Sequence, residues 1–196
     1  LHGKGFKPIG SSTARFTGTL EGKSKTITDL TIIRPTENGV GLFGYTSKAM
    51  IKDVGLVGGS VLGLNDVGCL VGYHTSSTIT ASYSTGTVSG RSYLGGLVGL
   101  SMASTIVSSH ATGSVGVSTS VGCVGGLVGA NNPSSGVSSI ITSSYATGSV
   151  ISKGYNIGGL VGQNNSTVTT CYATGSVSGG GFDVGGLVGY NPGEII

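Results

Sequence analysis

The stretch Gly95-Gly96-Leu97-Val98-Gly99 decides the fold, because it recurs along most of the chain. Unchanged copies occupy residues 125–129, 158–162 and 185–189, and near copies occupy residues 41–44 and 68–72. The steps between the ends of successive copies are 28, 27, 30, 33 and 27 residues. Such a period is typical of solenoids, propellers and arrays, in which each repeat buries its core against its neighbours.

A second motif, Tyr-Ala-Thr-Gly or a close variant, runs in phase with the first and begins at Tyr83, His110, Tyr145 and Tyr172. Around it, apolar and small polar residues alternate, which is the period-two pattern of a half-buried strand. The aligned apolar residues, which we expect to stack as a core, are Ile79, Ile106, Ile141 and Val168 upstream and Val88, Val115, Val150 and Val177 downstream. The sequence therefore predicts an all-β parallel β-solenoid of about six coils of about 27 residues.

The Leu and Val of the first motif are adjacent, so a straight strand would point them to opposite sides. A strand that is apolar on both faces is normally covered on both faces, and the flanking glycines allow other backbone to approach. We expect this segment to be sandwiched in that way. Its leucines, also assigned to the repeat core, are Leu42, Leu70, Leu97, Leu127, Leu160 and Leu187.

Composition supports strands and argues against several classes of partner. Glycine occupies 39 positions and charged residues make up 9%; Val, Ile, Thr and Ser dominate, and no segment has the period of a helix. Residues 1–52 carry a net charge of +5 and the remainder −2. The basic residues are dispersed, without interleaved aromatic rings, which favours a solvated cap over a nucleic-acid surface.

The ends of the chain differ from the repeats. Residues 1–37 are more charged and carry bulkier aromatics, so we expect an N-terminal capping segment with the first strands, followed by repeats over 38–196. Residues 190–196 resemble no cap, which predicts further repeats or another molecule at that end. With no initial Met and no signal peptide, the chain is expected to be a piece of something longer, and no apolar stretch is long enough to predict a membrane span.

The three cysteines, Cys69, Cys123 and Cys171, predict neither a disulfide framework nor a metal site. Cys171 aligns with Ser82, Ser109 and Ser144, so we expect it to be a small structural residue. No cofactor or metal is predicted.

Catalytic motifs are also absent from the sequence. Residues 39–44 match the Gly-x-Gly-x-x-Gly fingerprint of dinucleotide sites, but no helix is expected to follow. The acidic residues are expected to fall at different repeat phases and share no motif, and no His-Glu-x-x-His signature occurs. We expect no enzyme; a polysaccharide-active β-helix, using Asp66 or Asp183, is the distant alternative.

The two motifs together resemble the GLUG motif, a repeat of large secreted and cell-surface proteins of bacteria and archaea. The resemblance covers about residues 38–190, and residues 6–10 and 16–22 resemble the stretch that often precedes such repeats. It implies a right-handed parallel β-helix, an extracellular location and an adhesin-like context.

The Thr-Gly-Thr/Ser segments are the candidate binding feature. Stacked in register, they would form two files of hydroxyl groups, Thr85, Thr112, Thr147 and Thr174 in one and Thr87, Ser114, Ser149 and Ser176 in the other. A flat array of threonines on a β-solenoid can order water and bind ice. The alternative is that small residues suit a tight corner between strands.

These observations favour a non-catalytic extracellular structural or adhesive module. It would act either as the stalk of a surface adhesin or as a subunit whose open end pairs with the first coil of the next copy, giving a fibre. Ice binding is the rival function. Neither nucleic acid nor membrane is expected as a partner, and the sequence leaves any surface ligand open.

Overall fold

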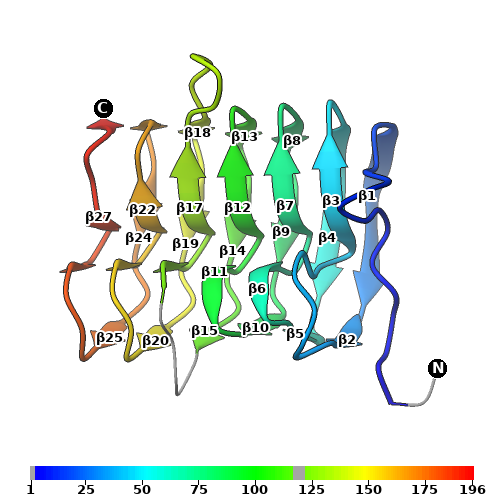
Figure 1. The fold of residues 1–196 in the computed structure, drawn as a ribbon, viewed down its shortest axis with the longest axis horizontal. Helices are drawn as coiled ribbons and strands as arrows, with labels where there is room; N and C mark the ends of the chain where they lie inside the picture. The colour runs from blue at the N-terminus through cyan, green and yellow to red at the C-terminus, as the bar shows by residue number, and fades with distance from the viewer. Residues whose placement is uncertain (1–2, 117–121) are drawn as a thin grey trace.

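Equivalent residues of successive repeats lie side by side on parallel strands. The computed structural model describes residues 3–116 and 122–196, and all regular structure within those ranges is β-strand (Figure 1). Ile106, for example, pairs with Ile79 of the preceding coil and Ile141 of the following one. The predicted parallel β-solenoid of about six coils is confirmed, with about 28 residues per turn. Residues that occupy one position of successive coils are called a column below.

Sheet 1 contains the Val-Gly end of the first motif. Its inward-facing column runs from Phe43 through Val71 and Val98 to Val188, and pairing is parallel throughout. The six strands are β3 (Phe43–Ser47), β7 (Val71–Thr75), β12 (Val98–Met102), β17 (Val128–Asn132), β22 (Val161–Asn164) and β27 (Val188–Tyr190).

Sheet 2 has two wings that are joined through one long strand, β4 (Met50–Val57). Wing 2a contains β8 (Thr78–Thr80), β13 (Thr105–Val107), β18 (Ile140–Thr142), β23 (Thr167–Thr169) and β28 (Glu194–Ile195). Wing 2b contains β9 (Tyr83–Ser84), β14 (His110–Ala111), β19 (Tyr145–Ala146) and β24 (Tyr172–Ala173). Strand β1 (Thr19–Thr28) pairs with β4 from the other side.

Sheets 3 and 4 complete each coil. Sheet 3 stacks the valine column of the second motif on β2 (Thr31–Ile33), β5 (Ser60–Leu62), β10 (Thr87–Ser89), β15 (Val115–Gly116), β20 (Val150–Ser152) and β25 (Val177–Gly179). Sheet 4 leads into the Gly-Gly corner and contains β6 (Asn65–Gly68), β11 (Ser92–Gly95), β16 (Val124–Gly125), β21 (Ile157–Gly158) and β26 (Val184–Gly185).

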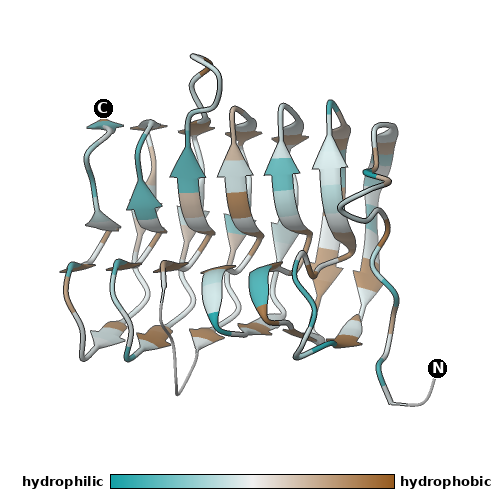
Figure 2. Cartoon of the chain, in the orientation of Figure 1, coloured by the Kyte–Doolittle hydropathy of each residue, from teal (hydrophilic) through white to brown (hydrophobic). Residues whose placement is uncertain are grey.

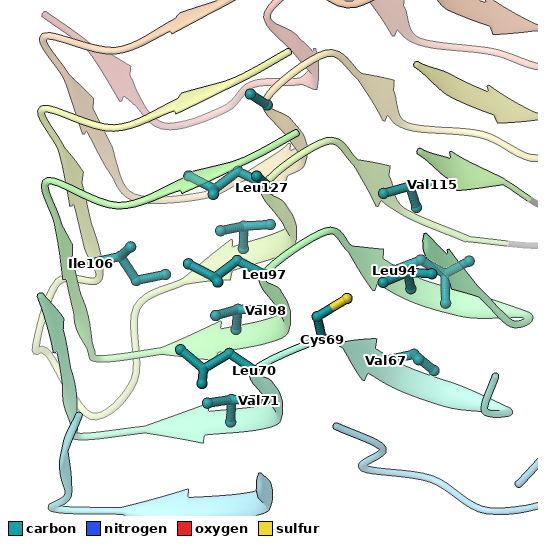
Figure 3. Close-up of a cluster of buried hydrophobic side chains, with 14 of the residues drawn as sticks. Val67, Cys69, Leu70, Val71, Leu94, Leu97, Val98, Ile106, Val115 and Leu127 are labelled. Atoms are coloured by element: carbon teal, nitrogen blue, oxygen red, sulfur yellow. The ribbon is translucent and has the colours of Figure 1, made fainter. Parts of the chain in front are cut away.

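The expectation that adjacent Leu and Val face opposite sides is wrong. Leu97 and Val98 are both fully buried in one core cluster, as are Leu127 and Val128 (Figure 3). The chain turns at Gly-Gly-Leu before β12 begins at Val98, so both side chains point inward. A Cβ on Gly126 would collide with the carbonyl oxygen of Gly159 and lie 2.9 Å from Ala146 Cβ. The two glycines therefore permit a corner tight enough to place consecutive residues in the core.

Serines satisfy the backbone between the wings of sheet 2. Ala81, Ser108 and Ser143 have φ of 48°, 49° and 49°, a left-handed conformation that L-residues adopt at a cost. The serine that follows each of them donates to a carbonyl of its own coil and accepts a backbone N–H of the coil before. Ser82 N, for instance, donates to Ser109 Oγ at 3.2 Å. These columns leave few backbone donors unpaired where the chain bends.

A column of buried polar side chains runs through the core beside sheet 1. It comprises Thr46, His74, Ser101, Asn131 and Asn164 and ends at the exposed Asn191. Asn131 Nδ2 donates to Asn164 Oδ1 at 2.8 Å, and Asn164 Nδ2 donates to Asn191 Oδ1 at 2.7 Å. Figure 2 shows the hydrophilic residues on β7, β17 and β22. Within this column His74 Nε2 and Asn131 Oδ1 have no hydrogen-bond partner among the described residues.

The two ends of the rod are built differently. At the N-terminal end β1 covers the edge of β4, the Phe16 ring packs 4.6 Å from that of Phe43, and Lys52 pairs with Glu21 at 3.1 Å. Lys23 lies in a bulge of β1, a device that discourages further strand pairing. At the C-terminal end, core columns reach solvent: Val184 and Ile195 are 45% and 46% exposed.

Candidate functional surfaces

The two predicted hydroxyl files lie on either side of a corner. The first file follows wing 2b and the second begins sheet 3, with the column of Gly86, Gly113, Gly148 and Gly175 between them. Their side chains are exposed or half-buried. Thr85 Oγ1 accepts the backbone N–H of Gly58 at 2.8 Å. The files flank a bend in the chain, so they do not form one flat face, and their binding role stays a prediction.

The predicted core columns are placed together inside the rod. Val88, Val115, Val150 and the leucines from Leu42 to Leu160 are at most 4% exposed. Val177 and Leu187, in the last coil, are partly buried against the same cluster.

A flatter threonine array, missed by the sequence analysis, covers the outer face of wing 2a. Each strand places two side chains outward on either side of the buried Ile or Val column. The half-buried outward threonines are Thr78, Thr80, Thr105, Thr142, Thr167 and Thr169, interrupted by Val107 and Ile140. Strand geometry sets these side chains about 6.6 Å apart along a strand and about 4.8 Å apart between strands. The Thr-x-Thr spacing around Ile79 is the sequence signal that could have revealed this threonine array.

A stack of aromatic rings runs along wing 2b. Tyr83, His110, Tyr145 and Tyr172 have successive ring centroids 5.0, 4.5 and 4.9 Å apart and interplanar angles of 3° to 5°. His110 thus replaces a tyrosine within the stack, and burial lowers its pKa. Its faces are covered by its neighbours, which fits a structural role.

The cysteines are free. Cys171 accepts the backbone N–H of Ser144 at 3.4 Å and donates to Thr169 O at 3.1 Å, as the aligned serines do. Burial raises the pKa of Cys69 to about 12, so the protonated thiol predominates there. No group of three or more His, Cys, Asp or Glu side chains within residues 3–116 and 122–196 could hold a metal ion.

The acidic residues named for catalysis are far apart along the rod but share one column. Asp66 precedes Val67 in the second coil and Asp183 precedes Val184 in the last, and the partners of these valines align across sheet 4. The expectation that the acids occupy different repeat phases is therefore wrong for this pair. Asp183 is exposed, whereas burial raises the pKa of Asp66 to about 6.

Two adjoining open clefts lie where sheet 4 meets sheet 1, and Asp66 lines the second of them. The first, of about 410 Å³, lies between the N-terminal loop at Ser11 and the ring of Tyr45. The second, of about 310 Å³, is lined by Asp66, Arg91 and Tyr93. Asn38 lines both clefts. These sizes fall at the lower end of small-ligand sites. Sequence reasoning missed the clefts because they are formed by residues from three coils.

In the part of the chain that the structure describes, no helix is long and apolar enough to cross a membrane.

Comparison with known proteins identifies the repeat. Residues 90–116 and 153–178 match the family described as the GLUG motif. Halomucin of Haloquadratum walsbyi (strain DSM 16790 / HBSQ001) is 41% identical over 89 residues, which is 43% of this chain. The chain spans about 1% of the length of halomucin, and no solved structure matches. Each matched segment begins directly after a strand of sheet 3 and ends in the sheet 3 strand of the next coil, so in these two segments the GLUG motif corresponds to one coil of the parallel β-solenoid.

Proposed function

We propose that the chain is a non-catalytic structural module of a secreted or cell-surface protein, a rod whose C-terminal coil stacks against another coil of the same kind. The GLUG motif and the similarity to a short stretch of the far longer halomucin support the surface location. The observation that carries the stacking is the exposed last coil. There, Val177, Leu187 and Val188 continue buried columns yet are only partly covered.

Gly186 offers a direct test of stacking. A Cβ on Gly126 or Gly159, in the same column, would collide with a glycine carbonyl of the following coil, whereas a Cβ on Gly186 would meet nothing within 4 Å. Gly186→Val should therefore leave the isolated rod intact and block a coil from stacking on it.

The experiment is negative-stain microscopy with light scattering over a concentration series. We expect wild-type particles to lengthen with concentration and Gly186→Val particles to remain single rods. Gly180→Val, also without a neighbour within 4 Å of its Cβ but outside the Gly-Gly corner, is the control. Single rods of wild type at every concentration would reject end-to-end assembly.

Ice binding is a second candidate, and the flat threonine array of wing 2a favours it over the corner files. The expected result is thermal hysteresis that Thr105→Tyr abolishes and Thr112→Tyr, at the corner, leaves in place. If only Thr112→Tyr abolished thermal hysteresis, the ice-binding surface would be the hydroxyl files at the corner and not the array of wing 2a. No hysteresis in wild type would remove this candidate.

A further inference from the structure

We propose that the two adjoining clefts around Asp66 bind neighbouring sugar units of a neutral polysaccharide, with the Asp66 carboxylate and the Asn38–Asn65 amide pair holding hydroxyl groups between the rings of Tyr45 and Tyr93. This role is independent of end-to-end stacking, because the clefts lie in the first three coils.

The Asp66 side chain is the central observation. It is half-buried and lines the second cleft, and its carboxylate makes no hydrogen bond or ion pair with another residue within 3–116 and 122–196. Both carboxylate oxygens are therefore open to a ligand in the cleft, and each can accept a hydrogen bond. Two adjacent hydroxyls of a sugar ring supply two such donors from one ligand.

The amide pair beside Asp66 supplies the complementary groups. Asn65 Nδ2 donates to Asn38 Oδ1 at 3.0 Å. Neither Asn38 Nδ2 nor Asn65 Oδ1 has a hydrogen bond within residues 3–116 and 122–196 that would occupy it. A donor and an acceptor therefore remain on the cleft wall. Sugar hydroxyls both donate and accept, so they match this mixed set better than a purely acidic or basic ligand does.

Two tyrosine rings flank the carboxylate. Tyr45 lines the first cleft, and its ring lies against Gly39, where any Cβ would collide with it. Tyr93 lines the second cleft. Tyr93 shares the second cleft with Asp66, and Asn38 lines both this cleft and the one that holds Tyr45. Burial raises the pKa of both phenols; Asp66 raises that of Tyr45 further, and Cys123 and then Asp66 raise that of Tyr93. Tyrosine combines an apolar ring face with a polar tip, which suits the apolar face and hydroxyl edge of a pyranose.

The charge of the clefts indicates a neutral ligand. Lys7 and Glu37 line the first cleft and Asp66 and Arg91 line the second, so the formal charges balance. A metal ion would meet one carboxylate beside a guanidinium group, which is a poor set of ligands for a hard cation.

The clefts end where the groove between sheets 4 and 1 fills with apolar side chains. In the following coils Leu100, Cys123 and Ala130 form a small second cluster, against which Tyr73, Tyr93 and Met102 pack. The clefts lie on the N-terminal side of this cluster, around Asn38, Asn65 and Asp66. A ligand that follows the rod axis would therefore be limited to the N-terminal part of the groove.

The test is affinity electrophoresis in native gels that contain yeast mannan, dextran or galactan, with alginate as an acidic probe. We expect at least one neutral polysaccharide to retard the wild-type chain. Asp66→Asn and Asn65→Ala should each weaken the apparent affinity at least ten-fold. Asp183→Asn is the matched control, because Asp183 occupies the same column on the exposed last coil, and it should bind like wild type.

Each other outcome counts against the proposal. Retardation by none of the neutral gels, or by alginate alone, overturns it, as does unchanged binding by both Asp66→Asn and Asn65→Ala. An equal loss in Asp183→Asn would place the binding elsewhere on the rod. Circular dichroism melting of each variant separates a lost contact from a lost fold.

Discussion

The last two coils and the first two coils use the same columns, but the residues within a column are more alike in the last two. Between residues 140 and 196 the columns hold nearly identical residues, such as Ala146 and Ala173 opposite the glycines of the corner. Between residues 38 and 93, Phe43 replaces the valine and Cys69 replaces a corner glycine. The clefts occur in this second region. Repetition thus builds the rod, and departures from repetition give part of it a chemically distinct surface.

The largest expected effect comes from breaking the regular region at its corner. Gly126→Ala should destabilise the fold by about 4 kcal/mol or more, because the new methyl group meets a carbonyl and a side chain that cannot both move. Gly186→Ala, in the same column, should change stability by less than about 0.5 kcal/mol. Urea denaturation of both variants measures the difference, and equal effects would contradict the corner geometry.

In the buried polar column, His74 occupies a position that is Ser or Asn in the following coils. We expect this histidine to make the rod acid-sensitive. Burial lowers its pKa to about 3, below the value of about 6.5 in the unfolded chain. The unfolded state therefore binds the proton first, and stability falls as pH drops from about 6.5 towards about 3, by about 3 kcal/mol at pH 4.

We expect the His74→Asn variant to lose this part of the acid sensitivity, since Asn occupies the same column at Asn131 and Asn164. Melting temperatures of the two proteins between pH 7 and pH 4 should converge or cross at the acid end. His110→Tyr, which restores the aromatic column, is the control and should alter the slope less. Parallel curves for wild type and His74→Asn would show that His74 does not carry the effect.

Asp66 should weaken the first coils at neutral pH. Because burial raises its pKa to about 6 from the ordinary 3.8, ionisation disfavours the folded state. Its cost is absent below about pH 4, grows as pH rises to about 6 and is constant above. Asp66→Asn, which keeps the size and suits a positive φ, should stabilise the protein by about 2 kcal/mol at pH 7.

The measurement is the difference in melting temperature between Asp66→Asn and wild type at pH 4 and pH 7. The other titratable groups are the same in both proteins, so their own contributions to the pH dependence cancel in the difference. A gain that is the same at both pH values would indicate a packing effect without any contribution from charge.

The smallest effect concerns a bend that the regular coils share. Ala81 has φ of 48°, where glycine is favoured over alanine. Ala81→Gly should stabilise the rod by about 1 kcal/mol. Ser82→Gly, at the next position, should instead destabilise it, because Ser82 Oγ accepts the backbone N–H of Val54 at 3.3 Å. Thermal melts of the two variants measure the difference in stability. A lower melting temperature for Ala81→Gly than for wild type would contradict the proposed backbone strain at Ala81.

Sequence reasoning succeeded where one column holds one kind of residue. Ile79, Ile106 and Ile141 alternate with polar neighbours, so their inward placement follows from the period alone. The direction of Leu97 was mistaken because local alternation cannot show that the chain turns at Gly96. The hydroxyl files stay a prediction as a binding feature, because the repeat phase of their residues does not distinguish a corner from a flat face.

The clefts could not be predicted from the sequence, for a physical reason. Asn38, Asn65 and Ser92 are about one coil apart in sequence, and they become neighbours only through stacking. The sequence signal for the clefts is an aligned column in which the residue type changes from coil to coil, whereas most columns keep one type. Within this fold, the aligned positions that break the pattern are the first places to look for binding residues.

The buried asparagine column gives the rod a direction. Asn131 donates to Asn164 and Asn164 donates to Asn191, so every amide dipole in this series points the same way. The serine columns agree, since the backbone of each coil donates to the hydroxyl of the next. Two rods that met tail to tail would bring like groups together, and only a head-to-tail arrangement would match donors with acceptors. The stacking proposed above would therefore be vectorial, with unlike ends that a partner can distinguish.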